Sequence, residues 1–197
     1  MIATTPRTSR DLRQIIIDKA TCLFAAHGYS ATSMREVASA CHCTKPSLYY
    51  YFASKDALYK TVIEVHLNVC ELMFQSLVAD DKSTRECLKT ATESYLEWAQ
   101  TNPCAMRLLQ RIETQPEEDA PEFNIAATRE MELTLVSSLI EKGIESGEIR
   151  AEIAPFDCAL LLAGSISFQI DMALGTGCWD RGRLLRTIDM IFDGIAK

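Results

Sequence analysis

The chain has 197 residues, of which 48% are hydrophobic and 24% are charged, a composition that is typical of globular proteins and excludes a disordered chain. No run reaches the ~18 consecutive apolar residues of a membrane-spanning helix, and the N-terminal residues lack the apolar core of a secretion signal. We therefore expect a cytoplasmic protein with no membrane partner. The net charge is −7, but residues 1–60 carry eight Lys and Arg against four Asp and Glu, which gives +4 there and −11 over residues 61–197. A basic head on an acidic body favours nucleic acid as a partner of the head.

Helical periodicity runs through the whole chain, and it begins with two helices before residue 42. The first is expected over about residues 9–27, with Gly28 as its left-handed end. The second is short and ends near residue 41. Its start is marked by Ser33 and Glu36, which form a capping box in which each side chain satisfies a backbone N–H of the other residue.

A third helix is expected to begin after Thr44, its N-cap, with Pro46 tolerated because first-turn N–H groups have no partner inside a helix. Ser54 then caps a long fourth helix that reaches about residue 78. Five further helices are expected, over residues 83–101, 103–114, 121–146, 156–174 and 180–195. The sequence thus predicts an all-α protein of about nine helices, with a three-helix head and a larger helical body.

The head carries a specific set of residues. They are Phe24, Gly28, Tyr29, Thr32, Ser33, Met34, Val37 and Ala38, followed by Thr44–Phe52, Lys55 and Leu58. In this order and spacing the chain resembles the TetR/AcrR family of bacterial regulators, over about its first sixty residues. The resemblance implies a helix-turn-helix whose second helix crosses the DNA backbone while the third enters the major groove.

The resemblance, together with the first-turn positions of the third helix, assigns DNA contacts to nine residues. Thr44 can bond a phosphate, side chains of the third helix reach base edges, and Lys55 stands at a helix N-terminus that favours phosphate. The nine are Ser33, Arg35, Thr44, Lys45, Pro46, Ser47, Tyr49, Tyr50 and Lys55. The apolar residues of the motif are expected to form the core of the head.

Two positions depart from the family pattern. His42 stands in the turn where the family usually has Gly, so the turn is either reshaped or strained. Pro46 removes one backbone donor from the third helix.

The aromatic run at residues 49–51 is compatible with DNA contact or with core packing. Three arginines suit either a minor-groove arm or a frayed terminus: Arg7, Arg10 and Arg13.

The resemblance implies that the body holds a dimer interface and a ligand cavity. Apolar residues of the last helix repeat at gaps of four, three and four, close to the spacing of a helix–helix seam. With the helix before it they could form a four-helix interface across a two-fold axis, or they could pack within one chain. The expected interface residues are Leu161, Gly164, Phe168, Leu184, Ile188, Ile191 and Ile195.

The cavity is less readable from the sequence. Large apolar residues that could line it, or could be plain core, are Trp98, Met106, Phe123 and Phe168. His66 and Cys70 lie one turn apart on the fourth helix and are added to the ligand-binding set. As an alternative, this pair could hold a metal ion with a further thiol such as Cys104. The other scattered cysteines are expected to act as small buried hydrophobes.

The sequence therefore predicts a ligand-responsive regulator, most simply a repressor, that binds palindromic operator DNA as a homodimer and releases it when a small molecule binds the body. Residues 1–53 would form the DNA-binding domain and residues 54–197 the effector and dimerisation domain. The ligand would tilt the fourth helix and change the spacing of the two recognition helices, which fit DNA only near ~34–36 Å. The alternatives are metal or thiol sensing on the same fold, and a helical interaction module without DNA binding. No catalytic motif is present, so we expect neither enzymatic activity nor a cofactor.

Overall fold

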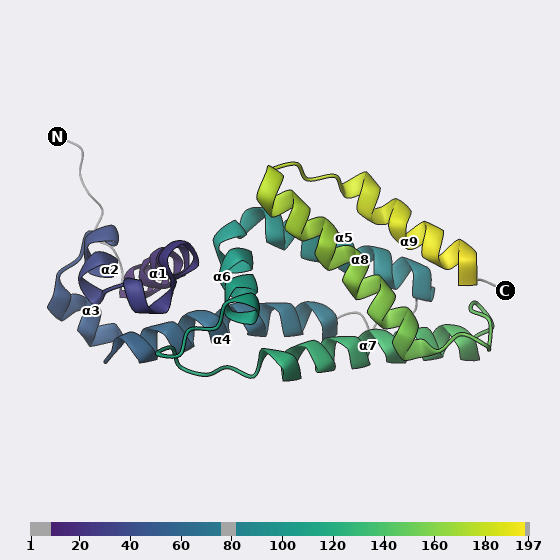
Figure 1. Ribbon diagram of the computed structural model, residues 1–197, viewed down its shortest axis with the longest axis horizontal. Coiled ribbons are helices and arrows are strands. Elements are labelled where there is room, and N and C mark those ends of the chain that lie inside the picture. Colours follow the sequence, from purple (N-terminus) through teal and green to yellow (C-terminus); the bar gives the residue numbers. More distant parts are fainter. Residues whose placement is uncertain (1–8, 76–81, 196–197) are drawn as a thin grey trace. The chain divides into compact units, whose positions relative to one another are not determined.

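The computed structural model describes the backbone of residues 9–75 and 82–195, and the side chains of residues 12–73 and 82–195. Over these residues it is built from nine α-helices and contains no β-strand, which confirms the predicted all-α class (Figure 1). The helices are α1 (Ser9–Ala31), α2 (Met34–Ala40), α3 (Lys45–Tyr51), α4 (Lys55–Gln75), α5 (Thr84–Thr101), α6 (Pro103–Thr114), α7 (Ile125–Glu145), α8 (Pro155–Thr176) and α9 (Arg181–Ile195). Arg7, the side chain of Arg10 and the predicted end of the fourth helix near Val78 lie outside the described residues.

The chain divides into two compact units. Unit 1 consists of residues 1–66 and 104–123, and unit 2 of residues 67–103 and 124–197. The division cuts through α4 after His66, so this single helix begins in one unit and ends in the other. The predicted domain boundary after residue 53 was a functional division, and it stays a prediction.

Unit 1 is closed by apolar side chains from α1, α3 and α4. Phe24, Leu48 and Leu58 are fully buried, and the ring of Phe24 meets the ring of Tyr59 edge to face at 4.9 Å between centroids. Such aromatic pairs add to the stabilisation from burial alone. The helical conformation of the first helix breaks at Gly28, as predicted, and one further turn within α1 continues to Ala31 beyond this break.

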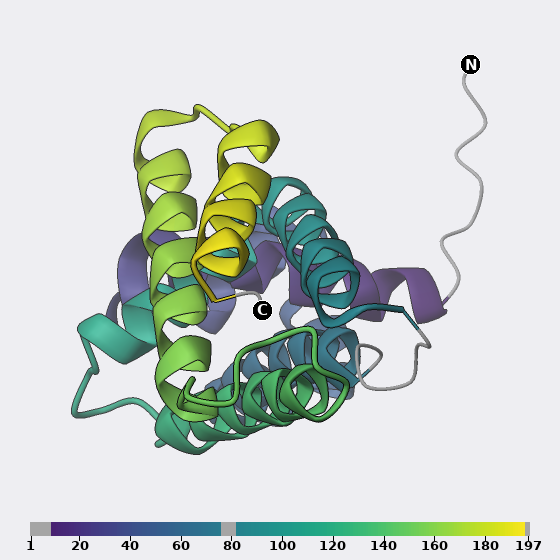
Figure 2. The same cartoon turned by 90° about the vertical axis from the view of Figure 1, so that its right-hand side faces the viewer.

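Unit 2 is a bundle whose core is shared by α5, α7, α8 and α9. Figure 2 shows α9 between α5 and α8. Leu88, Ile140, Ile188 and Phe192 belong to one buried apolar cluster. The α7 helix begins at Ile125 and not near Pro121 as predicted, because the Asn124 side chain accepts the N–H of Ala127 and caps the helix there.

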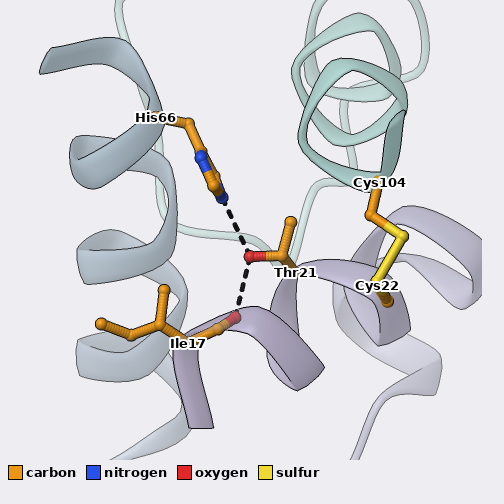
Figure 3. Close-up of a disulfide and its surroundings, with 5 residues drawn as sticks. All are labelled: Ile17, Thr21, Cys22, His66 and Cys104. Atoms are coloured by element: carbon orange, nitrogen blue, oxygen red, sulfur yellow. Dashed lines mark hydrogen bonds between the residues drawn. A yellow bond between two sulfur atoms is a disulfide. The ribbon is translucent and has the colours of Figure 1, made fainter. Parts of the chain in front are cut away.

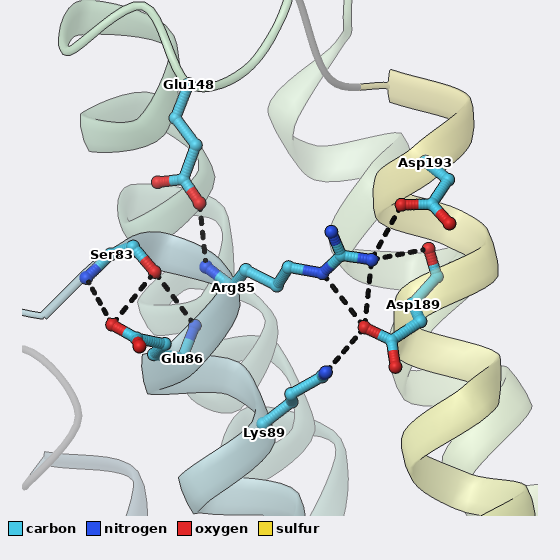
Figure 4. Close-up of polar contacts among 7 residues, drawn as sticks. All are labelled: Ser83, Arg85, Glu86, Lys89, Glu148, Asp189 and Asp193. Carbon is cyan, nitrogen blue, oxygen red and sulfur yellow. Dashed lines mark hydrogen bonds and ion pairs between the residues drawn. The ribbon is translucent and has the colours of Figure 1, made fainter.

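Charged groups fasten α5 to α9 (Figure 4). Arg85 donates from Nε to Asp189 at 2.9 Å and from Nη2 to Asp193 at 2.7 Å, and Lys89 pairs with the same Asp189 carboxylate at 2.5 Å. The Glu148 carboxylate accepts the N–H of Arg85, in addition to that of the preceding Thr84. The first turn of α5 is therefore held by side chains from distant parts of unit 2.

Candidate nucleic-acid interface and ligand cavity

The helix-turn-helix of unit 1 is set by local caps. The Ser33 hydroxyl accepts the N–H of Glu36 at 3.2 Å, and the Glu36 carboxylate accepts the N–H of Ser33 at 2.7 Å, which is the predicted capping box. The turn to α3 passes through His42, the one non-glycine residue with positive φ (50°) over the described residues. Thr44 then caps α3 by accepting the N–H of Ser47. The turn therefore has a left-handed residue at the position where the family usually has glycine, although this chain has His42 there.

The α3 helix presents a core side and a solvent side. Leu48 is fully buried and Phe52, just after the helix, is 3% exposed, whereas Tyr50 is 82% exposed. Tyr49 is also exposed, and the ring of Tyr51 lies edge to face with that of Tyr50 at 5.1 Å. The two tyrosines predicted to contact DNA are thus not core residues.

The nine predicted DNA-contacting residues all belong to unit 1, and none of them is buried. Ser33 and Arg35 are exposed at the start of α2, and Thr44, Lys45 and Pro46 are exposed at the start of α3. Their role in binding stays a prediction. Arg13, placed by one interpretation in an N-terminal arm, lies instead within α1, with its guanidinium 5.4 Å from the centroid of the Phe52 ring.

Lys55, at the start of α4, makes contacts that the sequence did not indicate. Its ammonium donates to the Ser30 carbonyl at 3.3 Å and lies 4.1 Å from the centroid of the Tyr29 ring. The Tyr29 hydroxyl donates to the neighbouring Asp56 carboxylate at 2.5 Å. Burial, together with this carboxylate, raises the pKa of Tyr29 to about 12. The lysine predicted to contact phosphate is therefore held against the end of α1.

A carboxylate from the segment after α6 holds the same end of α1. Glu117 accepts the N–H of Tyr29 at 2.8 Å and that of Ser30 at 2.9 Å, and it pairs with Arg111. Burial alone would raise the pKa of Glu117, but these donors outweigh it and hold the pKa below its ordinary value. The sequence did not indicate this contact, because nothing local links Glu117 to a backbone almost ninety residues earlier.

The carboxylate reaches α1 because Gly28 has no side chain. Gly28 has φ 84° and ψ 178°, a conformation that is essentially confined to glycine. A Cβ at this position would overlap the Glu117 carboxylate and lie 2.6 Å from Nη2 of Arg111. The glycine predicted as a helix end is thus required for a close approach.

The metal alternative is not supported by the groups around His66. Nε2 of His66 lies 3.0 Å from the Thr21 hydroxyl, which in turn donates to the Ile17 carbonyl (Figure 3). Burial lowers the pKa of His66 and raises that of the Cys70 thiol to about 12. The described residues include no cluster of three or more His, Cys, Asp or Glu able to hold a metal ion.

Cys104 was predicted to be an available thiol, and this is wrong. It forms a disulfide with Cys22, which joins the start of α6 to α1 within unit 1 (Figure 3). The two cysteines are 82 residues apart in the sequence, so no spacing rule pairs them.

Unit 2 contains a cavity of about 390 Å³, within the range of small-molecule sites. Its lining is mostly apolar and comes from α4, α5, α7 and α8. The lining residues are Met73, Leu88, Ala91, Thr92, Tyr95, Arg129, Glu132, Leu133, Val136, Leu160, Leu162, Ala163, Gly164, Ile166 and Ser167.

None of the six predicted ligand-binding residues lines this cavity. His66, Met106 and Phe123 belong to unit 1, and Phe168 is 66% exposed on α8. Cys70 and Trp98 belong to unit 2 but are not among the lining residues; the Trp98 ring stacks on that of Tyr95, which does line the cavity. Large apolar side chains can be recognised in the sequence as residues that form a core. The sequence does not show where such side chains leave a cavity between the helices.

The predicted dimer residues divide between the two last helices. On α8, Leu161 and Gly164 are exposed like Phe168. Phe156, Leu160 and Met172 extend this exposed apolar face, which we call the α8 face. By length and composition alone α8 also qualifies as a membrane span, with a mean hydropathy of 1.5 over its most apolar window and 33% of that window buried.

The four predicted interface residues of α9 face the core of unit 2, and their place in a dimer interface stays a prediction. Leu184 and Ile188 are 2% and 0% exposed and lie in the core of unit 2, and Ile191 and Ile195 pack against that core. The heptad-like spacing correctly indicated an apolar face, but the face is covered by the chain itself.

Comparison with known proteins identifies the family. The family model described as "Bacterial regulatory proteins, tetR family" matches residues 16–62. The chain is 26% identical over 177 residues to the HTH-type transcriptional regulator AcrR of Shigella flexneri, covering 85% of this chain and 80% of that protein. It is 24% identical over 154 residues to the HTH-type transcriptional repressor KstR2 of Mycolicibacterium smegmatis, covering 78% and 75%.

The fold agrees with these matches. The structure of the ketosteroid transcriptional regulator KstR2 of Mycobacterium tuberculosis superposes with a TM-score of 0.75 at 18% identity, over 100% of both chains. The family model covers the helix-turn-helix of unit 1, where α3 presents its exposed side chains, and the structural likeness extends over the whole chain. Residues 16–62 thus carry the helix-turn-helix of the TetR family of bacterial regulators, and the chain as a whole is similar to transcriptional regulators of that family.

Proposed function

We propose that the protein is a homodimeric repressor that binds a palindromic operator through α3 and releases it when a small molecule occupies the cavity of unit 2. The observation that carries this proposal is the division of α3 into a buried side, Leu48, and an exposed side with Lys45 in its first turn and Tyr50 in its second. Side chains at the N-terminal end of such a helix reach base edges in the major groove. Operator DNA is cytoplasmic in bacteria, so the protein would act there.

The charge of the head supports DNA as the partner. Residues 1–60 carry a net charge of +4 within a chain of −7, so the positive charge is concentrated in the segment of the chain that contains α3. Phosphate neutralisation by such charges makes affinity fall with salt. A protomer that reads one half-site needs a second copy of the chain to read the other. The exposed apolar α8 face is a surface on which that second copy could pack.

The operator contacts can be tested on DNA from upstream of the protein's own gene. We expect Tyr50→Ala and Lys45→Ala each to weaken operator binding by about 10- to 100-fold, because each removes a contact to DNA worth ~1–3 kcal/mol. Lys142→Ala removes the same charge as Lys45→Ala from an exposed position in unit 2 and is the matched control. Fluorescence anisotropy over a salt series measures the effect. Equal losses for Lys45→Ala and Lys142→Ala would show that α3 is not the reading helix.

The cavity of unit 2 is the proposed effector site. Its lining is largely apolar and holds one arginine and one glutamate, whose formal charges cancel, so an uncharged apolar molecule with one hydrogen-bonding group suits it. The ketosteroid regulator named above has the same fold. Because α4 is continuous from Lys55 to Gln75 and Met73 lines the cavity, a ligand that displaces this part of α4 would also act on its first turns.

The probe 1-N-phenylnaphthylamine, which is apolar and uncharged, tests this site. We expect its fluorescence to rise on binding the native protein, and Ala91→Trp to weaken that binding by about tenfold because the indole would occupy the cavity. Ala127→Trp, at an exposed position of α7 outside the lining, should leave binding unchanged. If both variants bind the probe as the native protein does, the probe binds elsewhere and the cavity is not the site.

A further inference from the structure

The Cys22–Cys104 disulfide joins two helices of unit 1 that are far apart in the sequence. Cys22 lies in α1, which packs on α2 of the helix-turn-helix, and Cys104 lies in the first turn of α6. The α6 helix follows α5 with only Asn102 between them, and Leu88, Ala91 and Tyr95 of α5 line the cavity. The bridge therefore connects the DNA-binding head to a segment that continues directly from a wall of the cavity.

The bridge is accessible to small molecules. Cys22 is exposed and Cys104 is half-buried. By contrast Cys70 and Cys158 are buried, and burial raises the pKa of both thiols, which keeps them in the unreactive protonated form. Exposed disulfides are the ones that thiols and oxidants reach, and they are the class that cycles between oxidised and reduced forms.

The bridge and a second attachment, made by hydrogen bonds, hold the α6 segment to α1. The second is the Glu117 carboxylate on the N–H groups of Tyr29 and Ser30, at the other end of the segment. The residue before Cys22, Thr21, contacts His66 of α4 (Figure 3). Reducing the bridge would remove the covalent attachment and leave only noncovalent contacts, so the freedom of α6 relative to α1 depends on the state of two sulfur atoms.

We propose that Cys22 and Cys104 form a reversible redox site that takes a hydroperoxide as oxidant and sets operator affinity by fastening α6 to α1; the regulatory part rests on the proposed function. The exposed Cys22 thiolate attacks the peroxide, which gives a sulfenic acid and releases an alcohol, or water from hydrogen peroxide. The Cys104 thiol then displaces water from that sulfenic acid and forms the disulfide. Overall, two thiols and one hydroperoxide give one disulfide, one alcohol and one water. A low-molecular-weight dithiol reverses the reaction by exchange.

The oxidised head is held in one arrangement before it meets DNA, so less conformational freedom is lost on binding. Pre-organisation of this kind strengthens binding without a new contact. We therefore expect the oxidised protein to bind operator about fivefold more tightly than the reduced protein.

The first experiment treats the full-length protein with hydrogen peroxide or with dithiothreitol and counts thiols by alkylation and peptide mass spectrometry. We expect peroxide to remove two thiols and to link the peptides that contain Cys22 and Cys104, and dithiothreitol to restore both. Cys22→Ser and Cys104→Ser should each prevent the link, whereas Cys178→Ser, at another exposed position, should not. Failure of the link to form, or to be reduced, overturns the redox site.

Operator affinity and hydrogen exchange then separate the site from its regulatory role. The native protein should change affinity between the two states, and both serine variants should be insensitive to peroxide. A change below about twofold, or weaker binding on oxidation, overturns the role in DNA binding. If neither state binds any operator, the proposed function fails, and amide exchange over residues 104–114 still decides the site: slower exchange in the oxidised protein supports the fastening of α6, and equal exchange refutes it.

Discussion

Replacing Gly28 by alanine is expected to lower the free energy of unfolding by about 3 kcal/mol, because two costs add. The backbone conformation at φ 84° and ψ 178° costs a non-glycine residue roughly 1–3 kcal/mol. The new Cβ would also displace the Glu117 carboxylate from the N–H groups of Tyr29 and Ser30, and hydrogen bonds to a charged group contribute about 1.5–3 kcal/mol. Urea unfolding followed by circular dichroism measures the change.

The matched control is Gly194→Ala. Gly194 lies in α9, where an added Cβ meets no atom within 4 Å, and alanine is the better helix former there by roughly 0.5–1 kcal/mol. This variant should be as stable as the native protein or more so. A loss of less than about 1 kcal/mol for Gly28→Ala would mean that the end of α1 adapts and that Glu117 is not bound there as described.

Replacing Phe168 by glutamate is expected to raise the dissociation constant of the dimer by about 100-fold or more. Phe168 is 66% exposed on the α8 face, beside Leu161 and Gly164. In a two-fold interface the substitution places two carboxylates in an apolar contact, and burying unpaired charges is strongly unfavourable. Sedimentation equilibrium measures the dissociation constant, and operator affinity should fall with it because each protomer reads one half-site.

The control for this substitution is Leu72→Glu. Leu72 is 65% exposed on α4, so it has nearly the same exposure and apolar character but lies outside the α8 face. Its replacement should leave the dimer intact. If Phe168→Glu stays dimeric at micromolar concentration, or if both variants dissociate, the α8 face is not the specific interface.

The sequence predicted those parts of the fold that depend on neighbouring residues. The capping box at Ser33 and the Thr44 cap each involve groups within four positions of one another, so their residue types carry the information. The exposed and buried sides of α3 follow in the same way from helical periodicity.

The remaining features depend on which elements meet, and periodicity does not specify that. The apolar stripe that contains Ile188 was correctly recognised, but whether α5 and α8 of the same chain cover it depends on tertiary packing. Glu117 meets Tyr29 and Cys104 meets Cys22 across more than eighty residues, without any local pattern. The cavity was missed for the same reason: it is space left between helices, and it is defined by side chains such as Ala91 and Val136 that do not fill it.

The long-range fastening of α5 to α9 has a consequence for synthesis on the ribosome. Arg85 meets Asp189 104 residues later in the chain, and Phe192 completes the core against which Cys87 and Leu88 pack. The core of unit 2 therefore stays open until Phe192 has been translated. Unit 1 needs nothing beyond Phe123, so it can fold while the chain is still growing, since domains generally fold as units during synthesis. The nascent protein thus has a finished head while α5 and α7 still expose apolar surface, and this is the interval in which a chaperone would be needed.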